Sequence, residues 1–317
     1  MNSTIKNVIK FIAGPLYTFK QKKMQQKLHD LQSTPKELAA FLYKRSFERD
    51  LNWANPVELN EKIRWIEFNT DISLWTRLAD KYLARFYVED HGYSDILVKL
   101  YGVWDKAEEI DFETLPKSFV IKTNHGCGEV IIVKDKNKVD LEVIRQKMKD
   151  YLSEAFGYSH AEIHYLNIPR KIIAEELLPI TSSFSSSMVD YKFYCINGEP
   201  YVCGVFYNRD SVTHKTWSSF YDMSWKRHED WRQKGIGGGQ GDVPCPQTFE
   251  LMKQACRDLC KDMPFCRLDF YESEGKMYFG EFTFTPATYS GGSMDKSLCL
   301  ELGKKLVLQS TKLCSLN

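Results

Sequence analysis

The sequence lacks any uninterrupted apolar run of about 18 residues, the length that a membrane-spanning helix needs, so we expect no such helix. It also lacks a large net charge, because 43 Lys and Arg residues are balanced by 42 Asp and Glu residues. This balance argues against nucleic acid as the main partner. The 317 residues are 43% hydrophobic and 27% charged, which is typical of a folded globular protein, and their number suggests about two structural units.

The nine cysteines include no Cys-x-x-Cys pair, a spacing found in many zinc and redox sites. Cys256, Cys260 and Cys266 form the only close group, and the first two would share one face of a helix. A metal site there is one interpretation. We favour buried free thiols in a reducing compartment, because no histidine lies close by in sequence and free cysteine behaves as a small apolar residue. Together with the lack of a signal-peptide pattern, this predicts a cytoplasmic protein.

Residues 1–30 differ from the rest of the chain in charge. Residues 1–29 contain six lysines and no acidic residue, and the apolar side chains from Ile5 to Phe19 recur at helical spacing. Such a basic amphipathic segment either docks on the protein body or lies on an anionic membrane surface. The second interpretation predicts peripheral contact of residues 1–30 with the inner face of the cytoplasmic membrane.

Helical patterns dominate from Pro35 to about residue 90, and strand patterns follow Leu115-Pro116. Asn197-Gly198 separates two of the strands and tolerates the positive φ angles of a type I′ turn. Strands are expected at residues 118–122, 129–133, 171–175, 190–196, 200–207, 265–272 and 276–284, with further helices at 141–156, at 248–261 and from 295 onward. We therefore predict an α+β fold in which helices precede antiparallel strands.

Two neighbouring strands carry acidic residues where a buried face would normally be apolar. Arg267 and Asp269 share one face of their strand, as Glu281 and Thr283 do on the next. Buried carboxylates need a compensating cation, so Asp269 and Glu281 could together bind Mg²⁺, which prefers one or two carboxylates plus phosphate oxygens. Alternatively, this face is exposed to solvent, or Asp269 pairs with Arg267 alone.

The metal interpretation depends on the register of these two strands. A two-residue turn at Glu274-Gly275 would pair Asp269 with Gly280 and turn Glu281 to the opposite face. An odd-numbered loop centred on Gly275 would instead bring Asp269 opposite Glu281. The metal site requires the second pairing.

A second group of residues suits the binding of phosphate. Lys122 ends a strand directly before a glycine loop, so its ammonium group and the backbone N–H groups of the loop could converge on anionic oxygens. The loop lacks the glycine and lysine spacing of a Walker A motif. Further along, an apolar strand ends in Glu175 and Glu176 and continues to Leu178, a connection suited to binding adenine and ribose.

The order of these residues resembles the ATP-grasp superfamily. It resembles most closely the TupA-like ATP-grasp family, which is associated with teichuronopeptide and other bacterial surface-polysaccharide synthesis. The phrases that carry the resemblance lie between about residues 50 and 300 and are Asp80-Lys81-Tyr82, Leu100-Tyr101-Gly102-Val103-Trp104-Asp105, Phe119-Val120-Ile121-Lys122-Thr123-Asn124-His125-Gly126, Asp190-Tyr191-Lys192-Phe193-Tyr194 and Tyr278-Phe279-Gly280-Glu281-Phe282-Thr283-Phe284.

The resemblance implies an ATP-grasp fold, in which two α+β subdomains sandwich ATP behind a helical N-terminal region. The expected parts are the basic N-terminal segment (1–30), the helical region (31–115), a subdomain with the glycine loop (116–178) and a subdomain with the metal-binding strands (179–317). Mg²⁺ would be bound by Asp269, Glu281 and Thr283, and catalysis would involve Arg267 and Lys192. The residues implied to contact ATP are Arg85, Lys122, His125, Gly126, Gly128, Glu175, Glu176, Leu178 and Lys192.

The activity that the resemblance implies is ATP- and Mg²⁺-dependent ligation of a carboxylate to an amine through an acyl phosphate. The implied substrates are a uronic-acid carboxylate of a surface polysaccharide or its precursor and an amino acid or small amine. Thr283 stands where related ligases commonly have asparagine, and Arg85 stands where lysine is usual. Two alternatives stay open, a sugar or amine kinase, in which phosphoryl transfer is the end point, and a nucleotide-binding scaffold that lacks turnover because of Thr283.

The segment from Gly235 to Gly241 is the most glycine-rich part of the chain, with four glycines in residues 235–239. Such a segment is either a plain surface connection or a lid that closes on ligand, because glycine gives the backbone wide conformational freedom. As a lid it would lie beside the ATP site and present Arg232 and Lys234 to an anionic acceptor or to phosphates.

Overall fold

The computed structural model describes residues 24–210, 213, 215–234, 238–239, 241–288 and 292–308. Residues 1–23, which contain most of the predicted amphipathic segment, lie outside the described residues, and residues 24–31 form a helix. Within the described ranges, none of the helices combines the length and the hydropathy that crossing a bilayer requires.

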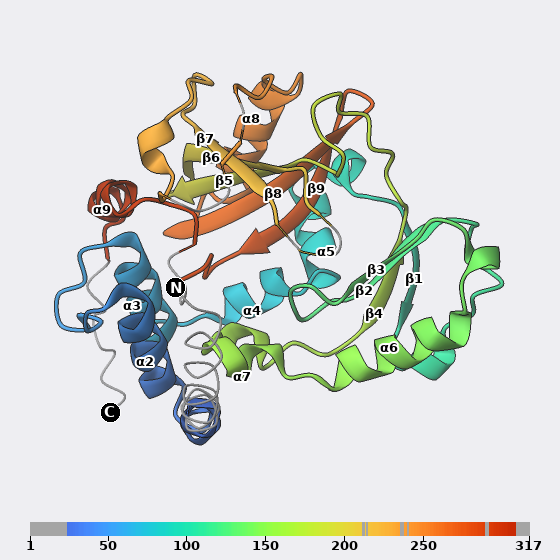
Figure 1. Cartoon of the computed structure of the whole chain (residues 1–317), viewed down its shortest axis with the longest axis horizontal. Coiled ribbons are helices and arrows are strands. Elements are labelled where there is room, and N and C mark those ends of the chain that lie inside the picture. Colours follow the sequence, from blue (N-terminus) through green and yellow to red (C-terminus); the bar gives the residue numbers. More distant parts are fainter. Residues whose placement is uncertain are drawn as a thin grey trace, which may run out of the picture.

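The strands form two antiparallel sheets with helices packed on them, so the protein has the predicted α+β architecture (Figure 1). The helices are α2 (Pro35–Phe47), α3 (Leu59–Asn69), α4 (Ser73–Ala79), α5 (Leu83–Asp90), α6 (Leu141–Ser153), α7 (Phe156–His160), α8 (Phe249–Leu259) and α9 (Lys296–Lys305). The strands are β1 (Leu100–Trp104), β2 (Phe119–Thr123), β3 (Val130–Val133), β4 (Ile172–Glu175), β5 (Asp190–Ile196), β6 (Glu199–Tyr207), β7 (Trp217–Tyr221), β8 (Phe265–Ser273) and β9 (Lys276–Thr283).

The first sheet has the strand order β1-β4-β2-β3, and α6 lies along one of its faces (Figure 1). Alternation along β2 turns Phe119 and Ile121 toward α6, where they pack with Ile144 and Met148 in a buried cluster. The same alternation turns Lys122 to the opposite face, where its Nζ contacts a carboxylate at the end of β4. The face of the sheet away from α6 therefore carries the charged residues.

Strand β1 was not predicted and lies inside residues 31–115, the part of the chain expected to be helical. It pairs with β4 in the first sheet. All five of its residues are half-buried, so the alternation of buried and exposed side chains that identifies a strand in sequence is missing. The region expected to be helical, residues 31–115, therefore also contributes one strand to the first sheet.

The second sheet has the order β7-β6-β5-β8-β9, and its core face packs against α8. Cys195 of β5 and Cys266 of β8 are neighbours on this face, and they are approached by Cys256 of α8 and by Cys260, the residue directly after α8. All four are buried free thiols, as expected. Across the described ranges no group of three or more Cys, His, Asp or Glu side chains is arranged to hold a metal ion, so the alternative of a cysteine metal site is not supported.

A buried ionic network joins the helical region to the segment that precedes β4. Arg64 of α3 is 1% exposed and donates to Glu67 Oε2 at 2.6 Å, to Ala161 O at 2.8 Å and to His160 O at 2.9 Å. Burial alone would raise the pKa of Glu67, but Arg64 and His164 outweigh it and lower that pKa below its usual range. Arg64 and Glu67 are therefore both charged, and each buried charge is compensated by the other.

We expect Arg64→Met to destabilise the protein by about 3–5 kcal/mol, because it leaves the Glu67 carboxylate buried without its charged partner. The matched control is Lys44→Met, which removes an ion pair to Asp50 whose side chains are 62% and 81% exposed. Such an exposed pair contributes at most about 1 kcal/mol. Urea unfolding of both variants measures the difference, and equal free energies of unfolding would contradict it.

Candidate active site

The two acidic strands adopt the pairing that the metal interpretation requires, by a route that the sequence analysis did not consider. The connection is the two-residue turn Glu274-Gly275, with φ of 51° and 71°. Asp269 nevertheless pairs with Glu281, because a β-bulge between Asp269 and Phe270 makes room for the extra residue Gly280 on β9. The prediction that this pairing needs an odd-numbered loop was therefore wrong, since the bulge supplies the shift within the strand.

Gly280 is required by this bulge because the neighbouring strand lies too close for a side chain. A Cβ built on Gly280 would lie 2.8 Å from the backbone oxygen of Asp269. We expect Gly280→Ala to destabilise the protein by about 1–3 kcal/mol, since either the bulge or β8 must move. Thermal unfolding tests this, with Gly92→Ala as a control in which no atom lies within 4 Å of the new Cβ and only the positive φ of +84° opposes a side chain. A smaller loss for Gly280→Ala than for Gly92→Ala would contradict the close packing at the bulge.

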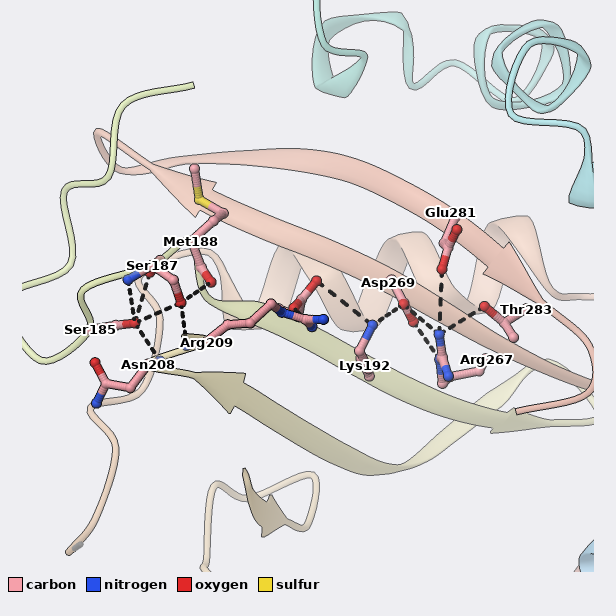
Figure 2. A network of polar contacts seen from close by, with 11 residues as sticks. Ser185, Ser187, Met188, Lys192, Asn208, Arg209, Arg267, Asp269, Glu281 and Thr283 are labelled. Atoms are coloured by element: carbon pink, nitrogen blue, oxygen red, sulfur yellow. Dashed lines mark hydrogen bonds and ion pairs between the residues drawn. The ribbon is translucent and has the colours of Figure 1, made fainter. Parts of the chain in front are cut away.

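Asp269 is held between two cations on the face of the second sheet opposite the one that packs against α8 (Figure 2). Arg267 forms two hydrogen bonds with it, from Nε to Oδ1 and from Nη2 to Oδ2, each of 2.7 Å. Lys192, its partner on β5, contacts the same carboxylate. Burial alone would lower the pKa of Lys192, but Asp190 and Asp269 outweigh it and raise that pKa, so the ammonium group stays charged.

Glu281 faces this group from the next strand and also lies among cations. Its Oε1 is 3.6 Å from Arg267 Nη2, and its Oε2 is 3.4 Å from Lys81 Nζ. Burial alone would raise the pKa of Glu281, but Lys81, Lys192, Arg267 and Lys122 outweigh it and lower that pKa to about 2. Thr283 Oγ1 accepts a hydrogen bond of 2.9 Å from Arg267 Nη2, as Figure 2 shows.

A second charged group lies on the first sheet. Glu175 at the end of β4 binds Lys122 Nζ at 2.5 Å and Arg85 Nη1 at 3.0 Å. Arg85 also donates to the backbone oxygen of Val98 at 2.6 Å, which fixes its guanidinium group. The sequence analysis placed Arg85, Lys122 and Glu175 in one nucleotide site, and the structure does bring these three residues together.

The glycine loop after β2 is anchored by two buried polar residues. Asn124 donates to Asp80 Oδ1 at 2.8 Å and to Pro169 O at 2.9 Å, and it accepts from the Lys171 N–H at 2.7 Å. Gly128 has a φ of +97°, which favours glycine. A Cβ on Gly126 would lie 2.2 Å from the carboxylate of Glu129, so any side chain at this position would have to displace that carboxylate.

The ring of His125, which was predicted to contact ATP, is buried beside the segment after α6. It is 2% exposed, and its Nε2 lies 3.0 Å from Glu154 O, in the segment after α6. Burial lowers the pKa of His125, so the ring is neutral at physiological pH. His125 was predicted to lie beside ATP because it is next to the loop glycines in sequence. In the structure its ring is buried and contacts the backbone of Glu154.

The connection between the two sheets begins at Glu176. Its N–H donates to Lys99 O at 2.9 Å and its side chain is exposed, while Leu178 is 9% exposed. Ser273 Oγ, at the turn end of β8, donates to Pro179 O at 2.7 Å. These contacts bring the predicted adenine-binding connection to the same end of the second sheet as the β8–β9 turn.

Lys81 is the residue that the sequence analysis missed as a member of this site. It appeared there only within the phrase Asp80-Lys81-Tyr82, without a role. Its Nζ donates to Gly126 O in the glycine loop at 2.5 Å and lies near Glu281 of the second sheet. The only signal in the sequence was the position of the lysine directly after Asp80. In the structure the Asp80 carboxylate accepts hydrogen bonds from the N–H groups of Tyr82 and Leu83.

The glycine-rich segment proposed as a lid lies partly outside the described residues, which omit residues 235–237 and 240. Gly238 forms an isolated bridge with Ser218 of β7. A Cβ on Gly239 would lie 1.7 Å from the hydroxyl oxygen of Tyr207. Alanine at Gly239 therefore tests packing rather than lid motion, and the lid remains a prediction.

Comparison with known proteins identifies the family of this chain. The TupA-like ATP-grasp family model matches residues 61–307. The chain belongs to the TupA-like ATP-grasp family. The ATP-grasp fold and the resemblance read from the sequence are thereby confirmed, and no curated protein matches the chain.

Solved ATP-grasp structures resemble this TupA-like chain at low sequence identity. A D-alanine–D-alanine ligase from Bacillus anthracis is 15% identical, with a TM-score of 0.41 over 72% of this chain and 61% of the ligase. An L-amino acid ligase from Bacillus licheniformis is 12% identical, with a TM-score of 0.44 over 83% of this chain and 57% of that ligase. The chain thus covers less than two thirds of the length of either ligase.

The side chains of this TupA-like protein fit ATP and Mg²⁺ in their chemistry. Asp269 and Glu281 are hard oxygen donors that face each other, although among the described residues they belong to no group of three or more metal-binding side chains. Mg²⁺ is commonly bound by one or two carboxylates together with phosphate oxygens. A carboxylate pair surrounded by Lys81, Lys192 and Arg267 suits a metal ion that arrives with anionic phosphates.

Proposed function

We propose that this protein is an ATP- and Mg²⁺-dependent ligase that joins a carboxylate to an amine. The observation that carries the proposal is the charged cluster of the second sheet. Asp269 and Glu281 are cross-strand partners, and Lys192, Arg267 and Lys81 contact their carboxylates. Membership of the ATP-grasp family supports ATP as the phosphoryl donor.

The chemical need for these charges follows from the reaction. A carboxylate is a poor electrophile, because attack by an amine would have to expel oxide, so one carboxylate oxygen must first receive the γ-phosphoryl group. In the resulting acyl phosphate the amine attacks the carbonyl carbon and phosphate leaves. Both steps develop negative charge on oxygens, and preorganised cations are the protein's main means of stabilising such charge.

The proposed roles follow from the positions of the side chains. Lys122 and Arg85, which share Glu175, would bind phosphate oxygens from the first sheet, and Lys192 would do so from the second. Asp269 and Glu281 would hold Mg²⁺, which when bound supplies positive charge to the phosphates. Arg267, fixed by Asp269 and Thr283, would stabilise the transferred phosphoryl group and the tetrahedral oxygen.

We propose a uronic-acid carboxylate, on a surface polysaccharide or its precursor, and an amino acid or small amine as the two substrates. The association of the TupA-like family with surface-polysaccharide synthesis supports this choice. The proposal also places the protein in the cytoplasm, with residues 1–30 in peripheral contact with the membrane. The six lysines of residues 1–29 support that contact, since each could contribute up to about 1 kcal/mol near an anionic surface.

A product screen tests the proposed activity. The full-length protein is incubated with ATP, Mg²⁺, a uronic acid and a panel of amino acids, and products are identified by mass spectrometry. The uronic acids are glucuronate and galacturonate, each supplied free and linked to UDP through the anomeric carbon, which leaves the carboxylate free. An amide formed together with ADP and phosphate supports the ligase. A stable phosphoester would identify a kinase. Nucleotide binding without any product would favour the alternative of a nucleotide-binding scaffold that lacks turnover because of Thr283.

A further inference from the structure

Glu162 is a buried acidic residue that the proposed roles leave unused. It lies in the segment between α7 and β4, and its Oε1 accepts a hydrogen bond from Thr285 Oγ1 in the loop after β9. The residue is 5% exposed, and Asp269, which is proposed to bind the metal, is 1% exposed. The low exposure of Glu162 therefore does not exclude contact with a substrate.

The hydrogen bond to Thr285 places Glu162 close to Arg267. Thr285 comes two residues after Thr283, so the Cα atoms of the two threonines are at most about 7 Å apart. Thr283 Oγ1 accepts a hydrogen bond of 2.9 Å from Arg267 Nη2, as Figure 2 shows. Glu162 thus lies near the arginine that is proposed to stabilise the tetrahedral oxygen.

The charges around Tyr165, on the same segment as Glu162, support this position. Burial raises the pKa of the Tyr165 phenol, Glu162 and Glu281 raise it further, and Arg267 lowers it. Glu162 therefore shares one electrostatic environment with a proposed metal ligand and with the arginine of the site.

The carboxyl group of Glu162 has no bonded cation, unlike the other acids near Arg267. Asp269 and Glu281 each contact two cationic side chains. Within the described ranges, Glu162 forms no ion pair with a lysine or arginine, and the Thr285 hydroxyl is its hydrogen-bond partner. Because a buried carboxylate without a cation is costly, a positively charged substrate group would be stabilised at this position.

The surroundings of Glu162 also suit the acceptance of a proton. Burial raises the pKa of Glu162, and His164 and Arg64 offset this effect only in part. A carboxylate with a raised pKa is a stronger base than an ordinary one. The ionisable groups around it are Arg64 and Glu67 of α3, His164 and Tyr165 of its own segment, and Cys127 of the glycine loop.

We propose that Glu162 receives the amine substrate: its carboxylate binds the incoming ammonium group and then acts as the general base of amide formation. This inference rests on the proposed function, because it assumes that an acyl phosphate forms beside Arg267. It adds the residue that recognises the second substrate, to which the proposed roles assign no side chain.

The proton balance of the step follows from the chemistry of the amine. An ammonium nitrogen loses two protons when it becomes an amide nitrogen. The first passes to the Glu162 carboxylate, which frees the lone pair for attack on the carbonyl carbon. As the C–N bond forms, the bond between the carbonyl carbon and the phosphate oxygen breaks, and phosphate leaves with the electron pair and takes the second proton. Glu162 then releases its proton to solvent.

The test compares two nucleophiles on the full-length protein. One is the amine identified in the product screen, and the other is hydroxylamine, which is uncharged at neutral pH and captures an acyl phosphate as a hydroxamate without needing a base. In Glu162→Gln, kcat/KM for the amine should fall by about 100-fold, the usual contribution of a general base, while hydroxamate formation should stay within about twofold of the wild type. Glutamine keeps an oxygen that can accept from Thr285, so a merely structural role of Glu162 predicts little change in either product.

Two further variants make the result specific. Glu154→Gln removes an exposed acid that lies between α6 and α7, and it should change neither product. If Glu162→Gln does not fold, Glu162→Asp decides. This variant keeps a carboxylate but withdraws it by one methylene group, so it should lower amide formation by about tenfold and leave hydroxamate formation unchanged.

The possible outcomes separate this inference from the proposed function. A kcat/KM for the amine within about threefold of the wild type overturns the role of Glu162 and leaves the ligase proposal standing. Equal losses of amide and hydroxamate also overturn it, because hydroxylamine does not need the base. Wild-type protein that forms neither product contradicts the proposed function itself.

Discussion

Replacing Glu281 by glutamine should lower kcat by about 10²–10³-fold, the usual cost of removing one group that stabilises charge in a transition state. The substitution keeps the shape of the side chain, which is 27% exposed, and removes its negative charge. Binding of ATP should change much less, because the proposed phosphate contacts come from Lys122, Arg85 and Lys192. Turnover is measured as ADP release, and ATP binding by calorimetry.

The control for this substitution is Glu301→Gln, an exposed position on α9. Because the pKa of Glu281 is lowered to about 2 from an ordinary value of 4.5, the carboxylate stays ionised above pH 4.5. Its contribution to folding stability is therefore complete above pH 4.5 and is lost as the pH falls toward 2. A Glu281→Gln enzyme with near wild-type kcat at saturating Mg²⁺ would show that this residue does not hold the catalytic metal.

Replacing Lys122 by methionine should weaken ATP binding by about 10–100-fold, the range expected when a charge-assisted hydrogen bond to phosphate is lost. Lys122 lies on the face of the first sheet away from α6 and is 18% exposed, so its ammonium group is desolvated only in part before nucleotide arrives. Glu175 keeps Arg85 as a partner in the variant, which limits the loss of stability.

Lys171→Met is the matched control, because Lys171 lies directly before β4 of the same sheet but pairs with Asp105. Calorimetric titration with an ATP analogue compares the two variants. A Kd for the Lys122 variant within about twofold of the wild type would exclude this lysine as a phosphate contact.

The sequence predicted those parts of the site that depend only on the alternation of side chains between the two faces of one strand. Arg267 and Asp269 are two residues apart in one strand, so they must share a face, and the structure joins them by two hydrogen bonds of 2.7 Å. Lys122 could be assigned in the same way, since Phe119 and Ile121 on the other face of β2 are apolar and buried. Such assignments need no knowledge of the tertiary structure.

Features that depend on contacts between distant segments could not be read in this way. The bulge at Gly280 arises between two strands, and the sequence offered only a choice of turn lengths. His125 was assigned by its neighbours, but its ring contacts Glu154, 29 residues away. Lys81 and Glu281 are 200 residues apart, and only the packing of the two sheets brings the ammonium group and the carboxylate together.

The central claim, that the protein activates a carboxylate as an acyl phosphate, is tested most directly by following oxygen. A substrate carboxylate labelled with ¹⁸O is ligated to the amine that the product screen identifies, and the inorganic phosphate is analysed by mass spectrometry. The labelled carboxylate oxygen attacks the γ-phosphorus and leaves with phosphate when the amine displaces it, so we predict one ¹⁸O atom in phosphate for each amide formed. Amide accompanied by unlabelled phosphate, or by label in AMP, would contradict the account.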